Sequence, residues 1–423
     1  MLSREDNEQL TRTGPGTPMG MLMRRYWFPV LLSEELPRPD CPPRRVTVMS
    51  ERLVAFRASD GSVGLVEERC PHRGASMFFG RNENGGLRCV YHGWKFDATG
   101  RCVDMPSEPP ESGFRNKVSI RAYPCEDRGG IVWAYMGPPG ERPAFPDLEW
   151  TRVPASQRYV TRRLQESNWF QGYEGGWDTT HLPFLHRGDI LPASVFGAPG
   201  AQAVKALPDV YEFVATEYGF VYGEGRHLPD GGMNWMVSLM FMPAWKTFQP
   251  FRLPDPRVSV LGWMPVDDRN CMIWAVEYHP GRPLRDDEMA WSRDQHRYIH
   301  VETLPGSLRP VRNRDNDYLV DRELQASGKS WMAIKGLGLQ DSAIQESMGA
   351  VADRSREHLN RGDEVIIKVR SQFLKMLRQG DMPLPGLDAA SYRVRAGFFD
   401  TPKGRTLEEA LADGVRAECP ASA

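Results

Sequence analysis

Two short Cys-His pairs constrain this 423-residue chain more than any other feature. The stretch CPHRGASMFFGRNENGGLRCVYHGWKF contains Cys70-x-His72 and Cys89-x-x-His92. Two thiolates with two imidazoles can bind a tetrahedral zinc ion, or a two-iron cluster in which two histidines replace two cysteines on one iron. In either case two ligand loops must close on one centre, and the surrounding fold has to hold them there.

The distribution of the four ligands favours the cluster over zinc. Zinc sites usually group Cys with Cys and His with His, whereas each arm here supplies one of each. A Rieske [2Fe–2S] cluster needs this arrangement, because each loop gives a thiolate to one iron and an imidazole to the other. Gly74 and Gly93 follow the two pairs and would let backbone N–H groups approach the sulfides. A structural zinc site is the alternative.

The strand and helix patterns divide the chain in two. Short β-branched and aromatic runs fill 44–136 and predict a small all-β unit. The proline-rich stretch GPPGERPAFP, Gly137–Pro146, predicts a boundary, since proline continues neither a ladder nor a helix. Beyond it, strand-like runs such as VYEFVAT and NWMVSLMFM mix with helical patterns. One such pattern follows Arg361, and Thr406 with Glu409 predicts a capping box. We expect an α+β second part with a sheet and helices on one side.

Composition and charge exclude several classes of protein. With 40% hydrophobic and 26% charged residues and a formal net charge of −2, the chain lacks the basic surface that a nucleic-acid partner demands. No apolar run approaches the roughly 18 residues of a membrane span. The start, MLSREDNEQL, lacks the apolar core of a secretory signal. Seven cysteines form no disulfide framework and fit a reducing compartment. We expect a cytoplasmic enzyme with no membrane or nucleic-acid partner.

A second candidate metal site follows the boundary. The stretch NWFQGYEGGWDTTHLPFLH contains Asp178-x-x-His181-x-x-x-x-His186, and two imidazoles at this spacing can face one ion across a helix turn or its end. Together with one carboxylate they make the facial triad of non-haem Fe(II) oxygenases, which leaves positions open for dioxygen. The alternative is two surface histidines at a helix end. His296 and His300 form another helical pair, but their charged surroundings favour a solvated helix face.

The motifs CPHRG and CVYHGWKFD resemble the Rieske domain of ring-hydroxylating oxygenase α subunits. The N-terminal GTPMGMLMRRYWFPV resembles the branch that contains phthalate 4,5-dioxygenase, phenoxybenzoate dioxygenase and dehydrodivanillate O-demethylase. The likeness covers nearly the whole chain. It implies an N-terminal segment at 1–43 that packs on the core and an all-β Rieske domain at 44–140. It also implies an α+β helix-grip (START-like) catalytic domain with an antiparallel sheet at 147–423.

The resemblance also implies roles for individual residues. In such α subunits, the aspartate that matches Asp178 bridges the iron ligand His181 to a Rieske histidine across a subunit boundary, here His92 of the partner subunit. This bridge requires a ring of subunits, a homotrimer or stacked trimers. The third iron ligand lies in an amide-acid step that enters a helix. Gln340-Asp341 matches that step, so Asp341 is the expected ligand beside His181 and His186, with Glu346 as the runner-up.

The function that the resemblance implies is that of a terminal oxygenase component. A separate flavin or iron–sulfur reductase, with or without a ferredoxin, would pass electrons from NAD(P)H to the cluster. The cluster would hand them to Fe(II) in the next subunit, where O2 is activated beside a small aromatic substrate. The stretch GYEGGW lacks the strand–turn–helix context of a nucleotide fingerprint, which agrees with NAD(P)H binding elsewhere.

The reaction and substrate are less closely defined by the resemblance. Members of the branch carry out dihydroxylation, monohydroxylation or O-demethylation, and an aromatic O-demethylase is the alternative function. The expected substrate is a carboxylated aromatic compound. Phthalate-oxidising members carry an arginine after a YGF step, whereas Val221 follows Tyr218-Gly219-Phe220 here. An alternative of another class is a Rieske electron carrier or zinc-binding module without oxygenase activity.

Overall fold

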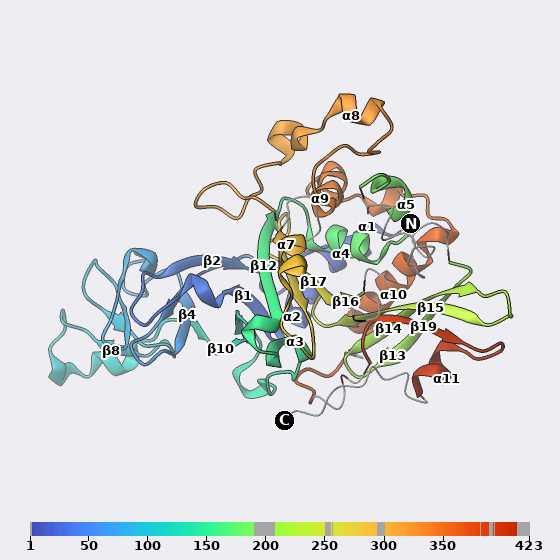
Figure 1. Ribbon diagram of the computed structural model, residues 1–423. Coiled ribbons are helices and arrows are strands. Elements are labelled where there is room, and N and C mark those ends of the chain that lie inside the picture. Colours follow the sequence, from blue (N-terminus) through green and yellow to red (C-terminus); the bar gives the residue numbers. More distant parts are fainter. Residues whose placement is uncertain are drawn as a thin grey trace. The chain divides into compact units, whose positions relative to one another are not determined.

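The chain forms two compact units, Thr13–Phe145 and the residues up to Arg12 together with those from Pro146 on. Figure 1 colours the first of these from blue to teal. The computed structural model describes residues 2–189, 208–249, 255, 257–293, 301–380, 382–388, 392 and 394–412. The contacts group 1–12 with the larger unit and 13–43 with the smaller one. The expected boundaries at 43, 140 and 147 stay a prediction.

The smaller unit is built from short antiparallel strands, as the runs at 44–136 predict. Two sheets have the strand orders β2-β3-β4-β9 and β5-β6-β7-β8, and a third has the order β1-β11-β10. Its helix and strands are α2 (Pro18–Arg24), β1 (Phe28–Leu32), β2 (Arg44–Val48), β3 (Glu51–Arg57), β4 (Val63–Glu67), β5 (Arg81–Glu83), β6 (Gly86–Arg88), β7 (Lys95–Phe96), β8 (Cys102–Asp104), β9 (Ala122–Tyr123), β10 (Cys125–Arg128) and β11 (Ile131–Ala134).

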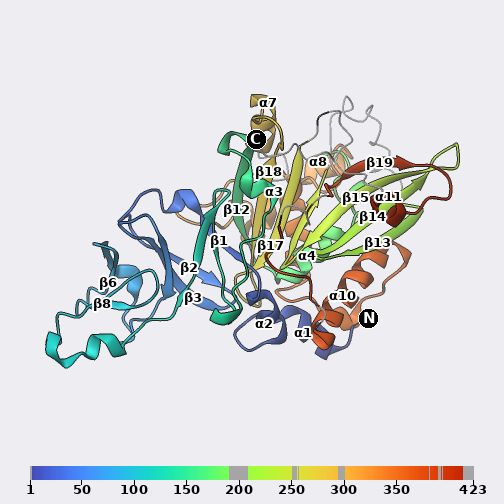
Figure 2. The same cartoon turned by 90° about the horizontal axis from the view of Figure 1, so that it is seen from below.

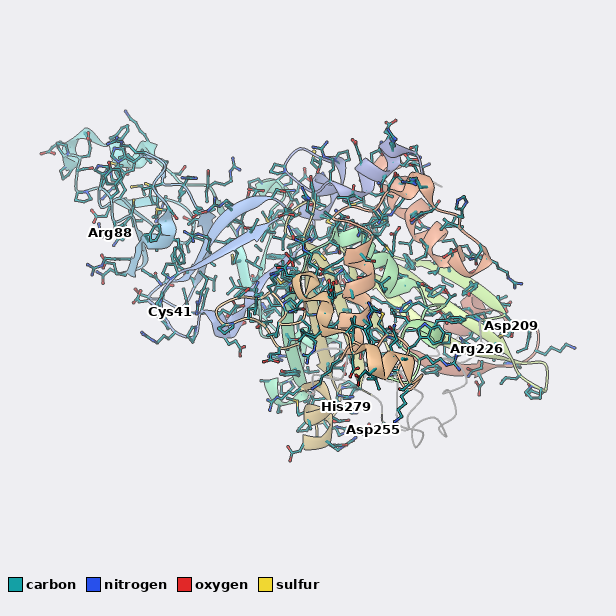
Figure 3. All side chains as sticks on the ribbon, turned by 90° about the horizontal axis from the view of Figure 1, so that it is seen from above. Cys41, Arg88, Asp209, Arg226, Asp255 and His279 are labelled. Carbon is teal, nitrogen blue, oxygen red and sulfur yellow. The ribbon has the colours of Figure 1, made fainter. Side chains whose placement is uncertain are left out.

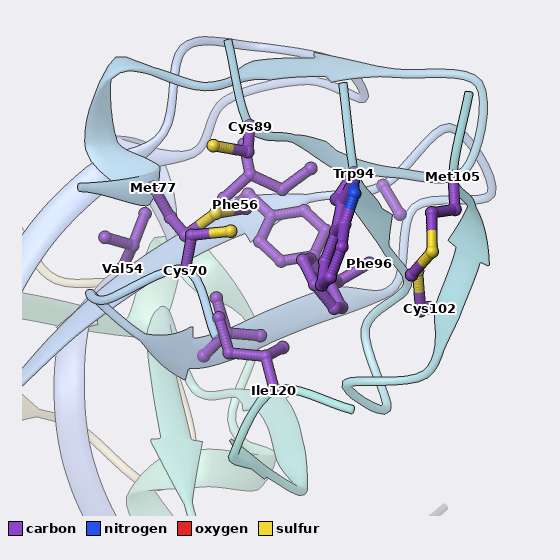
Figure 4. Packing of buried hydrophobic residues seen from close by; sticks show 13 residues of the cluster. Val54, Phe56, Cys70, Met77, Cys89, Trp94, Phe96, Cys102, Met105 and Ile120 are labelled. Carbon is purple, nitrogen blue, oxygen red and sulfur yellow. The ribbon is translucent and has the colours of Figure 1, made fainter. Parts of the chain in front are cut away.

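A hydrophobic cluster supports the two ligand loops of this unit. Phe56, Leu87 and Phe96 are fully buried in it, and Trp94 lies beside Phe56 (Figure 4). Cys70 and Cys89 belong to the same cluster, with 3% and 2% of their surfaces exposed. The thiols therefore lie on the side of the loops that is buried from solvent, where the burial of apolar surface stabilises the loops.

The larger unit contains an antiparallel sheet in the order β12-β18-β17-β16-β15-β14-β13, and β19 also pairs with β15 (Figure 1). Its described elements are α1 (Arg4–Thr11), α3 (Glu149–Arg152), β12 (Arg158–Gln165), α4 (Trp169–Trp177), α5 (Leu182–Leu185), β13 (Val210–Thr216), β14 (Gly219–His227), β15 (Met233–Phe241), β16 (Trp245–Phe248), β17 (Val258–Pro265), β18 (Cys271–Tyr278), α7 (Asp286–Arg293), α8 (Arg322–Ala326), α9 (Leu337–Ser347), α10 (Glu364–Gln379), β19 (Gly397–Thr401) and α11 (Leu407–Ala412). Thr406 and Glu409 form the expected capping box at the start of α11.

One face of this sheet is covered by α4, α9 and α10; Figure 2 shows α4 and α10 along that side. Glycines in α4 permit the close approach, because a Cβ at Gly172 or Gly176 would lie 2.3 or 2.2 Å from the ring of Trp263 on β17. Lys368 of α10 places its ammonium 4.6 Å from the ring centroid of Phe213 on β13. Together, these three helices cover one face of the sheet.

The opposite face also carries helices, so the expectation of helices on one side alone was wrong. Trp150 of α3 packs against Phe241 and Trp245, with ring centroids 5.7 and 6.1 Å apart. Leu407 of α11 lies against Gly223 of β14. Strand residues alternate between the two faces, and both faces of these strands are apolar, so each needed a cover.

Among the described helices, none combines the length and apolarity needed to cross a membrane.

Gly176→Ala should lower the free energy of unfolding by about 1–3 kcal/mol, because the added methyl overpacks the contact with Trp263. Urea unfolding followed by tryptophan fluorescence measures this change. Gly281→Ala is the matched control: Gly281 is exposed and a Cβ there lies no closer than 4.0 Å to His279. The control should stay within about 0.5 kcal/mol of the unchanged protein. Equal stabilities of the two variants would contradict close packing of α4 on β17.

Candidate metal centres

The two Cys-His loops of the smaller unit have the same backbone hydrogen bonds. In the first, Cys70 N donates to Ala75 O and Gly74 N donates to Cys70 O. In the second, Cys89 N donates to Trp94 O and Gly93 N donates to Cys89 O. Both glycines have φ near +75°, the left-handed region in which a side chain is strained. Each loop thus turns back on its own cysteine.

The loops bring the four side chains into one place. The rings of His72 and His92 have centroids 4.4 Å apart. His72 stacks on Trp94 at 4.4 Å and 14°, and Trp94 is held by a 2.9 Å bond from its Nε1 to Ser107 Oγ. Both histidines are partly exposed, whereas both cysteines are buried.

The donor chemistry of these side chains fits a Rieske cluster. His72 Nδ1 is buried and has no hydrogen-bond partner among the described residues. Burial raises the pKa of Cys70 to about 11, with the neighbouring Cys89 adding to the shift. A buried thiol pair beside an unpartnered imidazole nitrogen is stabilised by a cationic centre, which deprotonates the thiols and accepts the imidazole lone pair.

The second centre lies in the larger unit. His181 and His186 flank the single-turn helix α5 at its two ends, and Asp341 comes from the second turn of α9. The ligand atoms of these three residues all lie within 4.8 Å of one another. Asp341 Oδ1 is 3.4 Å from His181 Nε2 and 3.2 Å from His186 Nε2. Two imidazoles and one carboxylate on one side of a point make a facial set that leaves other positions open.

A second hydrogen bond orients each imidazole. Gln340 donates from Nε2 to Ile334 O and Asp189, so its Oε1 faces His186 and accepts from His186 Nδ1 at 2.7 Å. His181 Nδ1 lies 3.3 Å from Asp178 Oδ2. With both Nδ1 atoms bonded in this way, both Nε2 atoms point toward Asp341, which is the orientation that metal ligation requires.

Electrostatics favours a cation among these residues. Burial alone would raise the pKa of Asp341, yet the imidazoles of His186 and His181 hold it well below its usual range. Burial opposes charge on His181 as well, but hydrogen bonds to Asp178 and Asp341 raise its pKa to about 9. The arrangement therefore attracts positive charge, whether a proton or a metal ion.

A buried polar contact holds α9 in this position. Arg163 of β12 donates to Ser342 Oγ and to Gly338 O, both at 2.8 Å. Beside it, Gln165 of the same strand bonds Gln345 Oε1 at 2.8 Å. Both links run from the first strand of the sheet to one side of the helix, so the carboxylate of Asp341 is aimed at α5.

The runner-up carboxylate is directed elsewhere. Glu346 accepts a 2.5 Å hydrogen bond from Tyr318 Oη and a 3.0 Å bond from Glu166 N. Asp353, a third acidic residue of this segment, caps a short helix by accepting from Ser355 N. Of these carboxylates, Asp341 is the one that the fold brings to the two histidines.

A cavity of about 120 Å³ adjoins the triad. The sheet contributes side chains that alternate along its strands, so they project from one face. Apolar and aromatic side chains make up most of its sheet wall: Met236, Phe248, Leu261, Trp263 and Ile273. His181 and Asp341 line the same cavity, and so do the cationic Arg163 and Lys246. A cavity of roughly 150 Å³ binds benzene in another protein, so the volume of this one is of the order of a single aromatic ring.

Sequence reasoning did not single out several of these residues. Arg163 is one charged residue within an arginine-rich strand, and Lys246 follows the apolar run WMVSLMFMPAW directly. A lysine within an otherwise apolar strand pattern is the sequence signal that could have pointed to Lys246. The bond from His186 to Gln340 had no local signal, because the two residues lie far apart in the sequence.

The remaining histidines do not join either centre in the described part of the chain. His279 Nε2 lies 2.6 Å from Asp255 Oδ1 (Figure 3), and its Nδ1 accepts from Gly281 N and Arg282 N. Its ring therefore closes a turn. His296 and His300, the alternative helical pair, lie outside the described residues.

Two family models match the chain. A Rieske [2Fe-2S] domain matches residues 26–124, and a domain described as LigXa C-terminal domain like matches residues 134–396. The first contains both Cys-His loops, and the second contains strands β12 to β18, the two histidines that flank α5, and Asp341. These matches confirm the expected pairing of a Rieske domain with an α+β catalytic domain.

Characterised relatives cover nearly the full chain. The oxygenase subunit of 3-chlorobenzoate-3,4-dioxygenase from Comamonas testosteroni is 36% identical over 98% of this chain and 99% of its own length. The oxygenase subunit of phthalate 4,5-dioxygenase from Pseudomonas putida is 36% identical over 89% of this chain and 86% of its own. The dehydrodivanillate O-demethylase and phenoxybenzoate dioxygenase of the expected branch are relatives as well.

A solved structure shares the fold. Dicamba monooxygenase bound to dicamba aligns with a TM-score of 0.59 over 85% of this chain and 99% of its own, at 19% identity. Full-length relatives that are oxygenase subunits, together with the Rieske match, rule out the expected alternative of a bare electron carrier or zinc module. The chain belongs to the Rieske non-haem iron oxygenases, in which it is the terminal oxygenase subunit of a multi-component system.

Proposed function

We propose that His181, His186 and Asp341 hold Fe(II), that Cys70, His72, Cys89 and His92 hold the [2Fe–2S] cluster, and that the enzyme oxygenates a carboxylated aromatic compound. The observation that carries the proposal is the convergence of three Fe(II)-type ligands beside a mostly apolar cavity whose volume is of the order of one aromatic ring. When bound, the cluster supplies electrons one at a time and Fe(II) offers open positions for dioxygen.

The chain's own residues would position the substrate. Trp263 and Phe248 line the cavity, and such aromatic faces exclude water and hold a ring by stacking. Gln340 and Asp178 keep the two imidazoles oriented, so that the ligand nitrogens stay on one side and the cavity side stays free. The geometry thereby supports reaction at a carbon held next to the triad.

Asp178 is proposed as the link to the cluster of a partner subunit. Its Oδ2 faces His181 Nδ1, and its Oδ1 accepts from the N–H and hydroxyl of Thr180. A carboxylate has about four lone-pair sites, so acceptor capacity remains for a second imidazole, His92 of the partner subunit. This link calls for a ring of subunits, which we propose to be a homotrimer or stacked trimers.

Separate proteins would supply the electrons. Oxygenase subunits of multi-component systems work with electron-transfer partners, and we propose a flavin or iron–sulfur reductase that draws on NAD(P)H, with or without a ferredoxin. A cytoplasmic location is part of this proposal, because NAD(P)H and free thiols belong to a reducing compartment.

The substrate class follows the relatives named for 3-chlorobenzoate and phthalate, both carboxylated aromatics. Oxygen consumption and product mass with a panel of benzoates, phthalates and methoxybenzoates test the class and the reaction type together. Incorporation of one or two oxygen atoms from labelled O2 separates mono- from dioxygenation. Release of formaldehyde from a methoxybenzoate would identify demethylation instead.

Asp341→Ala should remove the mononuclear iron and abolish turnover, because two neutral imidazoles alone bind Fe(II) weakly without a hard anionic ligand. Iron analysis should then fall from three to about two iron atoms per chain, while the visible spectrum of the cluster is unchanged. Glu346→Gln is the matched control, because Glu346 lies on the same helix. This variant should keep all three iron atoms. Loss of iron from the Glu346 variant with an active Asp341 variant would reverse the assignment.

Asp178→Asn should leave both metal centres occupied but reduce turnover by about 100-fold, the upper end of the effect expected for loss of an outer-shell partner. The amide can still accept from one imidazole, but it carries no charge to balance two. Turnover with reductase and single-turnover reaction of the prereduced enzyme measure the effect. Activity close to that of the unchanged protein would contradict the bridge.

The reduction potential of the cluster should exceed that of an all-cysteine cluster and lie above about −150 mV. Neutral imidazole donates less charge than thiolate, so the reduced state is favoured. A redox titration followed by absorbance gives the potential, and the pH dependence of the potential reports on the two imidazoles. A colourless protein with one zinc per chain would contradict the assignment of these ligands to a [2Fe–2S] cluster.

A further inference from the structure

Lys246 is a buried cation in the wall of the cavity beside the triad. It lies on β16, and only 5% of its surface is exposed. Strand alternation puts its side chain on the cavity face together with Phe248. Its Nζ donates to Gly176 O at 2.7 Å, and it lies 4.8 Å from the ring centroid of Trp177. The ring centroid of Phe248 lies 5.4 Å from the same Nζ. One carbonyl and two ring faces satisfy only part of the capacity of an ammonium group, which has three donors.

No carboxylate in the described part of the chain forms an ion pair with this ammonium. The carboxylates whose charges act on this ammonium are those of Glu224 and Asp178, and each is engaged by other groups. Glu224 accepts from Thr179 Oγ1 at 2.6 Å and lies 3.5 Å from Arg226. Asp178 faces His181. A buried charge without a paired carboxylate is costly, so its presence here calls for a ligand.

The ammonium stays charged under ordinary conditions. Burial lowers the pKa of Lys246 to about 8, and the charges of Glu224 and Asp178 limit the fall. The larger part of the population is therefore protonated at neutral pH, and an anion in the cavity would meet a cation.

The other cation of the cavity already has a structural task. Arg163 donates to Ser342 and Gly338 and thereby holds α9. The position that carries arginine in phthalate-oxidising members is no substitute, because Val221 pairs with Leu239. Leu239 projects from the face of the sheet opposite to its neighbour Ser238, which lines the cavity. Among the described residues that line the cavity, Lys246 is thus the side-chain cation that remains available for a ligand.

We propose that Lys246 anchors the carboxylate of the substrate and thereby sets which ring carbon faces the triad. The inference rests on the proposed function and names the residue that selects its substrate class. Most of the rest of the sheet wall is apolar, so an aromatic acid would contact Lys246 with its charge and Leu261, Trp263 and Ile273 with its ring. One charged anchor plus a shaped apolar wall fixes orientation.

The test compares aromatic acids with their uncharged amides in the fully metallated enzyme. Benzoate, 3-chlorobenzoate, phthalate and 4-methoxybenzoate, each with its amide, are titrated by calorimetry into the unchanged protein and into Lys246→Gln, Lys246→Arg and Ser238→Ala. At least one acid should bind more tightly than its amide in the unchanged protein. Lys246→Gln should weaken that acid by about 10- to 100-fold, as expected for a charged hydrogen bond, and leave the amide nearly unchanged.

The other two variants serve as controls. Lys246→Arg should retain part of the preference for the acid, and Ser238→Ala, an uncharged change in the same wall, should retain all of it. A structural role for Lys246 would weaken acid and amide alike, so the ratio of the two affinities separates anchoring from folding. For turnover of the preferred acid, Lys246→Gln should raise KM more than it lowers kcat.

Two results would overturn the inference. One is a Lys246→Gln protein that keeps its full preference for the acid, and the other is an unchanged protein that binds none of the acids more tightly than its amide. Neither result touches the iron ligands, which are tested by iron content in the Asp341 variant. A failure of the anchor can therefore be told apart from a failure of the proposed function.

Discussion

The contact between β12 and α9 is the interaction on which the catalytic centre depends. Arg163 is buried and uses its guanidinium on Ser342 and Gly338, and Gln165 adds the bond to Gln345. These bonds fix the rotation of α9 together with those of Gln340 and Glu346, so that the carboxylate of Asp341 faces α5. Buried polar groups that are fully bonded specify one arrangement more strictly than apolar packing does. The proposed iron site is in this sense a consequence of how one strand holds one helix.

The cavity arises from the same geometry. Glycines in α4 let its backbone approach Trp263, which brings the residues that follow α4, Asp178 and His181, close to the sheet. The opposite wall of the cavity is one face of the sheet, whose side chains are mostly apolar. The cation of Lys246 sits within that face and bonds the backbone of α4 at Gly176. A position for a ring, a position for an anion and a metal site therefore adjoin one another.

The two centres are built by different means. The Cys-His loops are local structures: each closes on its own cysteine through two backbone bonds and a glycine with positive φ. The triad is assembled from segments far apart in the chain and needs second hydrogen bonds from Gln340 and Asp178 to orient its imidazoles. This difference explains why the first centre was readable as a motif, whereas the second was readable only in part.

Local patterns in the sequence were enough to predict the cysteine and histidine loops, the helix after Arg361 and the capping box at Thr406. They also predicted the longer strands β2, β3, β4, β11, β13, β15, β17 and β18. Each of these depends on spacing, turn residues and side-chain alternation within a few residues. The His181–His186 pair was also visible, because one helical turn separates the two rings.

The choice of Asp341 needed a resemblance, since spacing alone cannot rank it against Glu346. The fold separates them by tying Glu346 to Tyr318 and Glu166. Helices on both faces of the sheet, the bond of Gln340 to His186 and the place of Lys246 in the cavity wall depend on contacts between distant segments, which short-range patterns do not encode.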